Sequence, residues 1–144
     1  MIKSVLPIKI LNIEGDGFHL LIEAQINKVN ATLLIDTGAS KSVLDSNRIH
    51  QFVPVSEFEE NEQLSTGLGT NSMTSHSTSI DLLKLGKIEI PAYKVVIIDL
   101  SHVNESYEKL GLSSIDGVLG SDLLLKYKAV IDYNKLQITL CEEK

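Results

Sequence analysis

The chain has 144 residues, 43% hydrophobic and 22% charged, which predicts one globular domain spanning residues 1–144. The formal net charge of -6, with no cluster of lysine and arginine, argues against binding to nucleic acid or to an anionic membrane surface. A single cysteine, Cys141, excludes an internal disulfide, and four dispersed histidines give no metal-ligand spacing, so we expect no metal and no other cofactor.

The N-terminal residues, MIKSVLPIKILNIEG, carry Pro7, Lys9, Asn12 and Glu14 at short intervals. They therefore lack the continuous apolar core of a signal peptide or of a membrane span. We expect no membrane association and a cytoplasmic location.

Short apolar runs separated by Gly, Asn, Asp and Ser predict a protein built mainly from strands and turns. Residues 18–26 (FHLLIEAQI) and 31–35 (ATLLI) predict two strands joined by a turn at residues 27–30. This hairpin places Asp36 at the end of a strand. Residues 42–44 predict a short strand. It is followed by a polar stretch up to Phe52 that is compatible with a helix, and then by an acidic loop at residues 57–62.

Residues 64–79 (LSTGLGTNSMTSHSTS) are rich in Gly and in small hydroxyl side chains, a composition that favours a long flexible hairpin over a buried strand. Residues 80–85 and 88–100 predict two strands that meet at Gly86-Lys87. Residues 101–114 are polar and fit either a short helix or a loop.

The C-terminal part predicts one short helix and a last hairpin. Residues 121–127 (SDLLLKY) fit a helix with Ser121 as its N-cap and Asp122 as an acid in its first turn. Residues 129–132 and 137–140 predict two strands around a turn at residues 133–135.

Three motifs on these elements carry a family resemblance. They are Asp36-Thr37-Gly38-Ala39-Ser40 after an apolar strand, Gly67-Leu68-Gly69-Thr70 in the glycine-rich hairpin, and Gly117-Val118-Leu119-Gly120 before the short helix. In this order the motifs resemble those of the retropepsin-like aspartic proteases, and bacterial single-domain members more than the retroviral enzymes. The resemblance covers nearly the whole chain. It implies an all-β, retropepsin-like acid protease barrel with a flap hairpin and one short C-terminal helix, assembling as a two-fold homodimer.

The resemblance also implies the reaction, which is cleavage of peptide bonds in an extended polypeptide by an aspartic endopeptidase. Such hydrolysis needs one group that deprotonates the attacking water and one that protonates the carbonyl oxygen. Two aspartates about 3 Å apart share a proton and supply both groups. We predict Asp36 to be catalytic. The chain carries one Asp-Thr-Gly motif, so the second carboxyl must come from a second copy, with the two-fold axis between the two Asp36 side chains.

The other motif residues receive supporting roles. Gly38 permits close approach of another backbone and can donate its N–H group. By resemblance, Thr37 cross-links the paired loops, and the residues of the 67–70 motif form a flap over bound peptide. Residues 117–120 are expected to pack beneath the active site, and the terminal strands, near residues 1–10 and 137–142, to contribute to the dimer interface.

The remaining aspartates that lie near the motifs are interpreted as structural. Asp116 and Asp132 are expected to form turns, and Asp122 to belong to a helix N-terminus. Asp81 and Asp99 have no adjacent loop of small residues.

The sequence departs from the retroviral pattern at two positions. Ser40 and Ser121 stand where those enzymes usually carry an acidic residue and an arginine, whose ion pair braces the dimer. Replacing both leaves no unpaired buried charge but removes that brace.

Two alternative functions are compatible with parts of the sequence. The first is a peptide-binding module of the same fold, inactive or weakly active, which Asp36→Asn separates from a protease because cleavage would be lost while binding remains. The second is a phosphotransferase of the sugar-kinase and actin type, whose phosphate loop also begins Asp-x-Gly-x-Ser. That architecture needs two larger lobes, which 144 residues do not supply.

Overall fold

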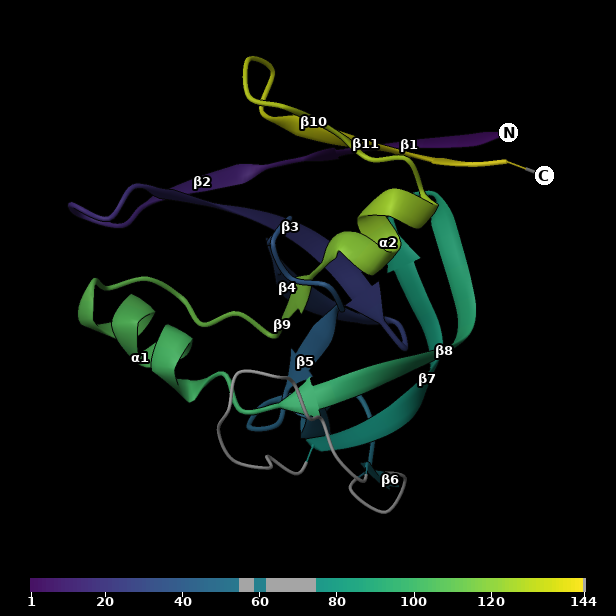
Figure 1. The fold of residues 1–144 in the computed structure, drawn as a ribbon, viewed down its shortest axis with the longest axis horizontal. Coiled ribbons are helices and arrows are strands. Elements are labelled where there is room, and N and C mark those ends of the chain that lie inside the picture. The colour runs from purple at the N-terminus through teal and green to yellow at the C-terminus, as the bar shows by residue number, and fades with distance from the viewer. Residues whose placement is uncertain (55–58, 62–74, 144) are drawn as a thin grey trace.

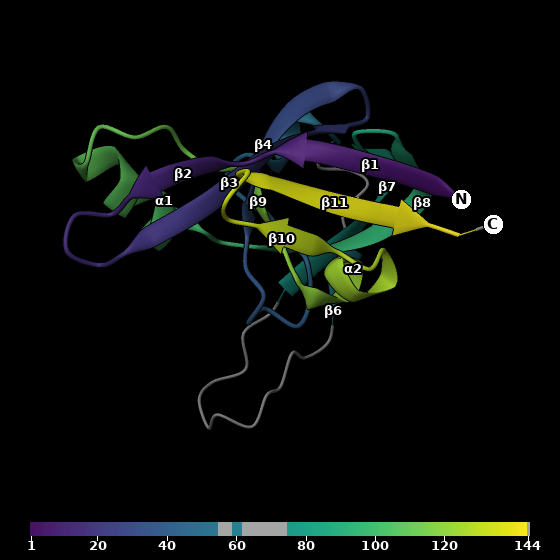
Figure 2. The ribbon, with the colours of Figure 1, turned by 90° about the horizontal axis from the view of Figure 1, so that it is seen from above.

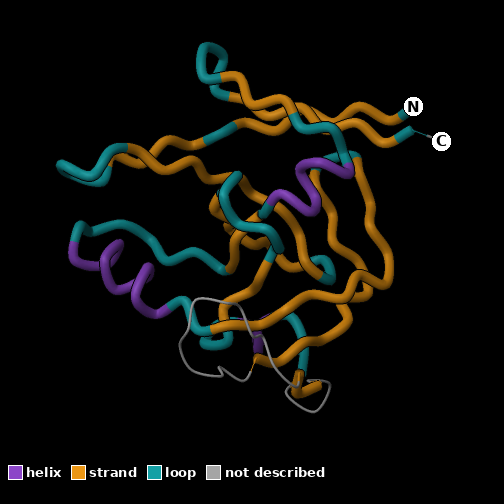
Figure 3. Tube along the Cα trace, in the orientation of Figure 1, coloured by secondary structure: helices purple, strands orange, loops and turns teal. Residues whose placement is uncertain are grey.

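The structure is a computed structural model that describes residues 1–54, 59–61 and 75–143. Strands dominate the trace and the helices are short (Figure 3). No helix within these ranges is long and apolar enough to cross a membrane. In chain order the elements are β1 (Ile2–Pro7), β2 (Lys9–Asn12), β3 (Phe18–Ile26), β4 (Val29–Ile35), β5 (Val43–Asp45), the 3-10 helix η1 (Ile49–Gln51), β6 (Glu59–Asn61), β7 (Ser75–Leu85), β8 (Ile88–Ile98), α1 (Ser101–Lys109), β9 (Gly117–Leu119), α2 (Ser121–Lys126), β10 (Val130–Asp132) and β11 (Gln137–Glu142).

Six strands close into a barrel. They are hydrogen-bonded in the order β3-β4-β9-β5-β8-β7, and β7 returns to β3 through the pairs Gln25↔Lys84 and Ile26↔Leu83. Along β3, Ala24 and Ile26 are buried whereas Glu23 and Gln25 are exposed, as expected for a strand with one face toward a core. The all-β barrel predicted from the sequence is confirmed.

The β3–β4 hairpin that leads to Asp36 turns at Asn27 and Lys28. Both residues have positive φ angles, 50° and 71°, as a two-residue hairpin turn requires. The Asn27 side chain donates to the Phe52 carbonyl at 3.1 Å and accepts from the Leu82 N–H at 3.0 Å, so it ties the turn to its neighbours. Because this turn needs two residues and not four, β4 begins at Val29, earlier than predicted.

A separate three-stranded sheet brings the two ends of the chain side by side (Figures 1 and 2). Its central strand, β11, pairs antiparallel with β1 from Ile2↔Glu142 to Pro7↔Gln137, and with β10 from Val130↔Thr139 to Asp132↔Gln137. The last hairpin predicted from the sequence is therefore confirmed. β11 uses both of its edges within its own chain, and β1 and β10 are the edge strands.

A second apolar cluster lies beside the barrel, where the β2–β3 hairpin and α1 project on the same side of the molecule (Figure 1). It includes Leu11, Leu21, Leu100 and Tyr107, and the Tyr107 hydroxyl lies 2.6 Å from Nδ1 of His19. The stretch 101–114, for which helix and loop were both open, holds α1 followed by a loop. This helix is additional to the one expected near the C-terminus, and Val103 and Tyr107, four residues apart, give it an apolar face.

β7 begins at Ser75 and buries Ser77 and Thr78, so the sequence prediction of a flexible hairpin in preference to a buried strand is wrong for residues 75–79. β6 pairs antiparallel with β7 from Glu59↔Ser77 to Asn61↔Ser75. Residues 59–61 are therefore a strand, whereas the sequence predicted a loop over the whole acidic segment. The flap candidates Gly67, Leu68, Gly69 and Thr70 lie outside the described residues.

Candidate active site

Asp36 directly follows the last residue of β4, at one end of the barrel. β4 runs parallel to β9, in the register Leu33↔Gly117, Leu34↔Val118 and Ile35↔Leu119. Because parallel strands end at the same side of a sheet, the Asp36 loop (residues 36–42) and the supporting segment (residues 117–122) leave the barrel together. The structure thus brings two of the three sequence motifs into contact.

The Asp36 loop is a tight turn around its own carboxylate. The Gly38 N–H donates to Oδ1 of Asp36 at 3.0 Å, and the Ala39 N–H donates to the Asp36 carbonyl at 3.1 Å. The Asp36 N–H in turn donates to the Leu119 carbonyl at 3.0 Å. Asp36, Thr37, Gly38 and Ser40 are exposed and Ala39 is half-buried, so in a single chain the carboxylate is held in place and open to solvent.

Glycine is required at both ends of the Gly117-Val118-Leu119-Gly120 motif because other backbone segments lie so close. A Cβ atom on Gly120 would lie 2.8 Å from the Ala39 carbonyl oxygen and 2.8 Å from the Lys41 carbonyl oxygen, both in the Asp36 loop. A Cβ atom on Gly117 would lie 2.5 Å from the carbonyl oxygen of Val43, the first residue of β5. Val118 and Leu119, the two residues between the glycines, are buried, at 8% and 1% exposed. The motif therefore allows the supporting segment to pack closely against the Asp36 loop at Gly120 and against β5 at Gly117.

Sequence reasoning missed one connection between these segments. Asp122 is an acid in the first turn of α2, as predicted, but its Oδ1 also accepts the backbone N–H of Ser42 at 3.0 Å and the Ser42 hydroxyl at 2.8 Å. The Tyr93 hydroxyl lies 3.3 Å from Oδ2 of Asp122. Burial, followed by the neighbouring Asp122 carboxylate, raises the pKa of Tyr93 well above its usual value. No spacing rule relates these three residues.

The predicted N-cap is wrong by one position. Gly120 occupies the cap of α2 without a side-chain cap bond, and Ser121 is the first helical residue. The reason lies in the Asp36 loop, because the Ser121 N–H, which is free at a helix start, donates to the Ala39 carbonyl at 2.7 Å. The partner of Ser121 is thus Ala39, the residue before Ser40.

The other aspartates make structural contacts. Asp116 is buried and accepts the Thr32 N–H at 2.8 Å and Nε of Arg48 at 2.8 Å, so it forms an ion pair where the sequence predicted a simple turn. Asp132 accepts the Lys135 N–H at 2.9 Å within the last turn. Asp99 accepts the Ser101 N–H at 2.8 Å at the start of α1. Asp81 is exposed on β7.

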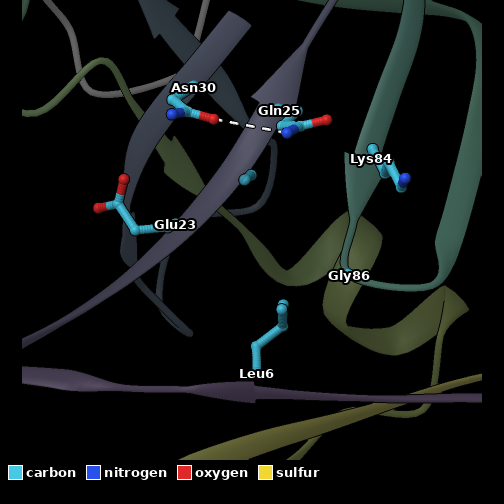
Figure 4. Close-up of a pocket in the computed structure, with 7 residues that line it drawn as sticks. Leu6, Glu23, Gln25, Asn30, Lys84 and Gly86 are labelled. Carbon is cyan, nitrogen blue, oxygen red and sulfur yellow. Dashed lines mark hydrogen bonds between the residues drawn. The ribbon is translucent and has the colours of Figure 1, made fainter. Parts of the chain in front are cut away.

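A cavity of about 310 Å³ opens where β3, β4, β7 and β1 meet (Figure 4). Its lining residue on β4, Asn30, lies at the beginning of that strand, whereas Asp36 follows the end of the strand. Gln25 and Asn30, which are paired across β3 and β4, lie side by side at its edge, with Nε2 of Gln25 3.5 Å from Oδ1 of Asn30. This cavity is therefore separate from the candidate site. Its labelled lining residues are Leu6, Glu23, Gln25, Asn30, Lys84 and Gly86.

Solved structures with the same fold define the class of protein. The chain is similar to a retropepsin-like aspartic protease from Rickettsia conorii, with a TM-score of 0.57 and 23% identity over 97% of this chain and 95% of that chain. It is similar to the retroviral protease-like domain of Ddi1 from Leishmania major, with a TM-score of 0.58 and 17% identity over 85% and 87% of the two chains. EIAV protease in complex with the inhibitor HBY-793 matches with a TM-score of 0.55 and 20% identity over 78% and 90%. The fold is that of the retropepsin-like proteases.

The family follows from the sequence itself. A family model described as aspartyl protease matches residues 22–123. The match covers most of the chain and includes both the Asp36 loop and Gly117-Val118-Leu119-Gly120. The chain therefore belongs to the aspartyl protease family. A search of curated proteins gave no match.

Proposed function

We propose that this protein is an aspartic endopeptidase in which Asp36 is the catalytic residue. The observation that carries the proposal is the position of Asp36 at the end of β4, with Oδ1 held by the Gly38 N–H, in a chain of the aspartyl protease family. One Asp36 carboxylate takes a proton from water as the water attacks the peptide carbonyl. A second carboxyl, protonated, gives its proton to the carbonyl oxygen.

The second carboxyl comes from the Asp36 of another copy of the chain, so the active species is a homodimer with its two-fold axis between the two loops. The exposure of Asp36, Thr37 and Gly38 in the single chain supports this assembly, because it leaves the loop accessible to its twin. In the dimer Thr37 links the two loops by hydrogen bonds, and Gly38 lets them approach. The two carboxyls then share one proton, since two charged carboxylates at that distance repel each other.

The substrate is an extended peptide or protein segment that lies across the paired loops. Residues 67–70 act as a flap that covers it and offers backbone hydrogen bonds, in the manner of an added strand. Residues 1–144 act as one protease domain, without a cofactor. β1 and β10, the free edges of the terminal sheet, are the strands of that sheet that can still pair with a partner.

The decisive test is Asp36→Asn against a peptide library at several pH values. We expect the wild-type protein to cleave, a statine-type transition-state mimic to inhibit it, and Asp36→Asn to lose cleavage with an unchanged melting temperature. The exposed position of Asp36 supports the expected stability of the variant. If the wild-type protein binds peptides and never cleaves them, the peptide-binding module is the better description.

A further inference from the structure

Five hydrogen bonds join the Asp36 loop to the supporting segment. Four are donated by backbone N–H groups: Asp36 to the Leu119 carbonyl at 3.0 Å, Ser121 to the Ala39 carbonyl at 2.7 Å, Gly120 to the hydroxyl of Ser42 at 2.8 Å, and Ser42 to Oδ1 of Asp122 at 3.0 Å. The fifth is donated by the Ser42 hydroxyl to Oδ1 of Asp122. The loop that carries the carboxylate is therefore fixed at both of its ends.

Ser42 is the link between the two segments at the far end of the loop. Its side chain is buried, with the residue 6% exposed, and its hydroxyl oxygen accepts from Gly120 while its hydrogen is donated to Oδ1 of Asp122 at 2.8 Å. A hydroxyl can accept and donate at once, which an aliphatic side chain of the same size cannot do. Ser42 thus completes a chain of hydrogen bonds from the loop to α2.

Asp122 is the acceptor at the end of this series of hydrogen bonds. Its Oδ1 accepts from the Ser42 N–H, the Ser42 hydroxyl and the Leu123 N–H, at 3.0, 2.8 and 2.8 Å. Every one of these partners donates, so the position requires an acceptor oxygen. Asp122 belongs to α2, and its carboxylate points toward the Asp36 loop.

We propose that Ser42 and Asp122 form a clamp that positions the catalytic loop, so that they are positioning residues for the reaction and not structural residues alone. This inference rests on the proposed function. Two carboxyls from two chains share a proton only if each loop presents its own at a fixed height and angle, and a displacement of about 1 Å lowers the rate about a hundredfold. The clamp acts on the loop's end while the Gly38 N–H orients the carboxylate itself.

The geometry distinguishes two substitutions at position 122. In Asp122→Asn the amide oxygen can still accept all three donors, and the amide nitrogen would face the Tyr93 hydroxyl, which can accept. In Asp122→Ala no acceptor remains. We expect Asp122→Ala and Ser42→Ala to lower kcat about ten- to a hundredfold with a smaller change in KM, and Asp122→Asn to restore kcat to near the wild-type value with the same pH profile.

A matched control separates positioning from loss of stability. Asn27→Ala removes two hydrogen bonds at the β3–β4 turn, at the other end of β4 from Asp36. We expect this variant to lose melting temperature and to keep its kcat. If Asp122→Ala keeps kcat, or if Asp122→Asn is as impaired as Asp122→Ala, the clamp is not a positioning device.

A second measurement does not depend on proteolysis. Amide hydrogen exchange of Asp36, Gly120 and Ser121 reports directly on the contacts that the clamp maintains. Faster exchange at these amides in Asp122→Ala, with protection retained in Asp122→Asn, supports the clamp even if the wild-type protein cleaves no peptide and the proposed function fails. Unchanged exchange in Asp122→Ala overturns the clamp, whether or not the protein is a protease.

Discussion

Two glycines near the carboxylate differ in what surrounds them. A Cβ atom on Gly120 would collide with the carbonyl groups of Ala39 and Lys41, which belong to the chain's own Asp36 loop. Among the residues that the structure describes, a Cβ atom on Gly38 would meet only Oδ1 of Asp36, at an ordinary contact distance of 3.4 Å. Within one chain, therefore, position 120 has no room for a side chain and position 38 does.

This difference predicts opposite outcomes for two matched substitutions. Gly120→Ala should lower the free energy of unfolding by about 1–3 kcal/mol, because backbone atoms must move to admit the methyl group. Gly38→Ala should unfold at nearly the wild-type denaturant concentration and yet lose activity, since the methyl group would lie in the path of a partner loop. Urea unfolding and peptidase assays on both variants check this. A fully active Gly38→Ala protein would contradict close approach of a second loop.

At this scale the sequence predicted the position of Asp36 but not its surroundings. An apolar strand followed by small residues was sufficient to place the carboxylate at a strand end. The contacts of Ser42 with Asp122, and of Asp116 with Arg48, join residues far apart in the chain. They arise only when β4 and β9 pair, and neither composition nor residue spacing predicts that pairing.

At the scale of secondary structure elements, an exposed carboxylate contacts the first residue of α1. The Asp99 carboxylate accepts the Ser101 N–H, and also the Asn47 side-chain amide at 2.8 Å. These hydrogen bonds hold the pKa of Asp99 below its usual value of 3.8, and the bond from the Ser101 backbone has the largest effect. A carboxyl group with a lower pKa in the folded state than in the unfolded state stabilises the fold at pH values above its unfolded-state pKa. This stabilisation is lost as the pH falls through the folded-state pKa.

Asp99→Asn keeps an acceptor oxygen and removes the charge. We expect it to be less stable than the wild type near neutral pH, and the difference between the two to shrink as the pH falls below 3.8. Urea unfolding followed by circular dichroism over a pH series measures this difference. A gap that stays constant down to the acid limit would show that the charge of Asp99 does not stabilise α1.

Elements with an apolar run bounded by clear turn residues were predicted best. The loosely alternating β3 strand has the predicted bounds, and the β7–β8 hairpin turns at the predicted Gly86-Lys87, although β7 begins at Ser75 and not at Ile80. The sequence does not distinguish a helix from a loop at α1, because its residues are mostly polar and only Val103 and Tyr107 mark an apolar face. β6 was missed because Glu59-Glu60-Asn61 looks like a solvated acidic run, and its pairing with β7 depends on backbone groups that composition does not report.

At the scale of the whole molecule, the proposed dimer predicts how activity responds to dilution and to mixing. Specific activity should fall as the protein is diluted through the dimer dissociation constant. After subunit exchange, equal amounts of wild type and Asp36→Asn should retain about one quarter of the activity of an all-wild-type sample at the same total concentration, because only wild-type pairs carry two aspartates. Analytical ultracentrifugation over the same concentration range checks the assembly. A value near one half, with no dilution effect, would indicate that each chain works alone.

The pairing of β1 with β11 has a consequence for how this protein is made. A chain leaves the ribosome from its N-terminus, so β1 emerges long before β11, the strand that it pairs with. Contacts between strands so far apart in the sequence also form slowly, because a long loop must close first. The terminal sheet can therefore assemble only after β11 has been made, and until then a nascent chain lacks that sheet. Because the proposed dimer uses the edges of this sheet, the topology would delay any peptide cleavage until β11 has left the ribosome.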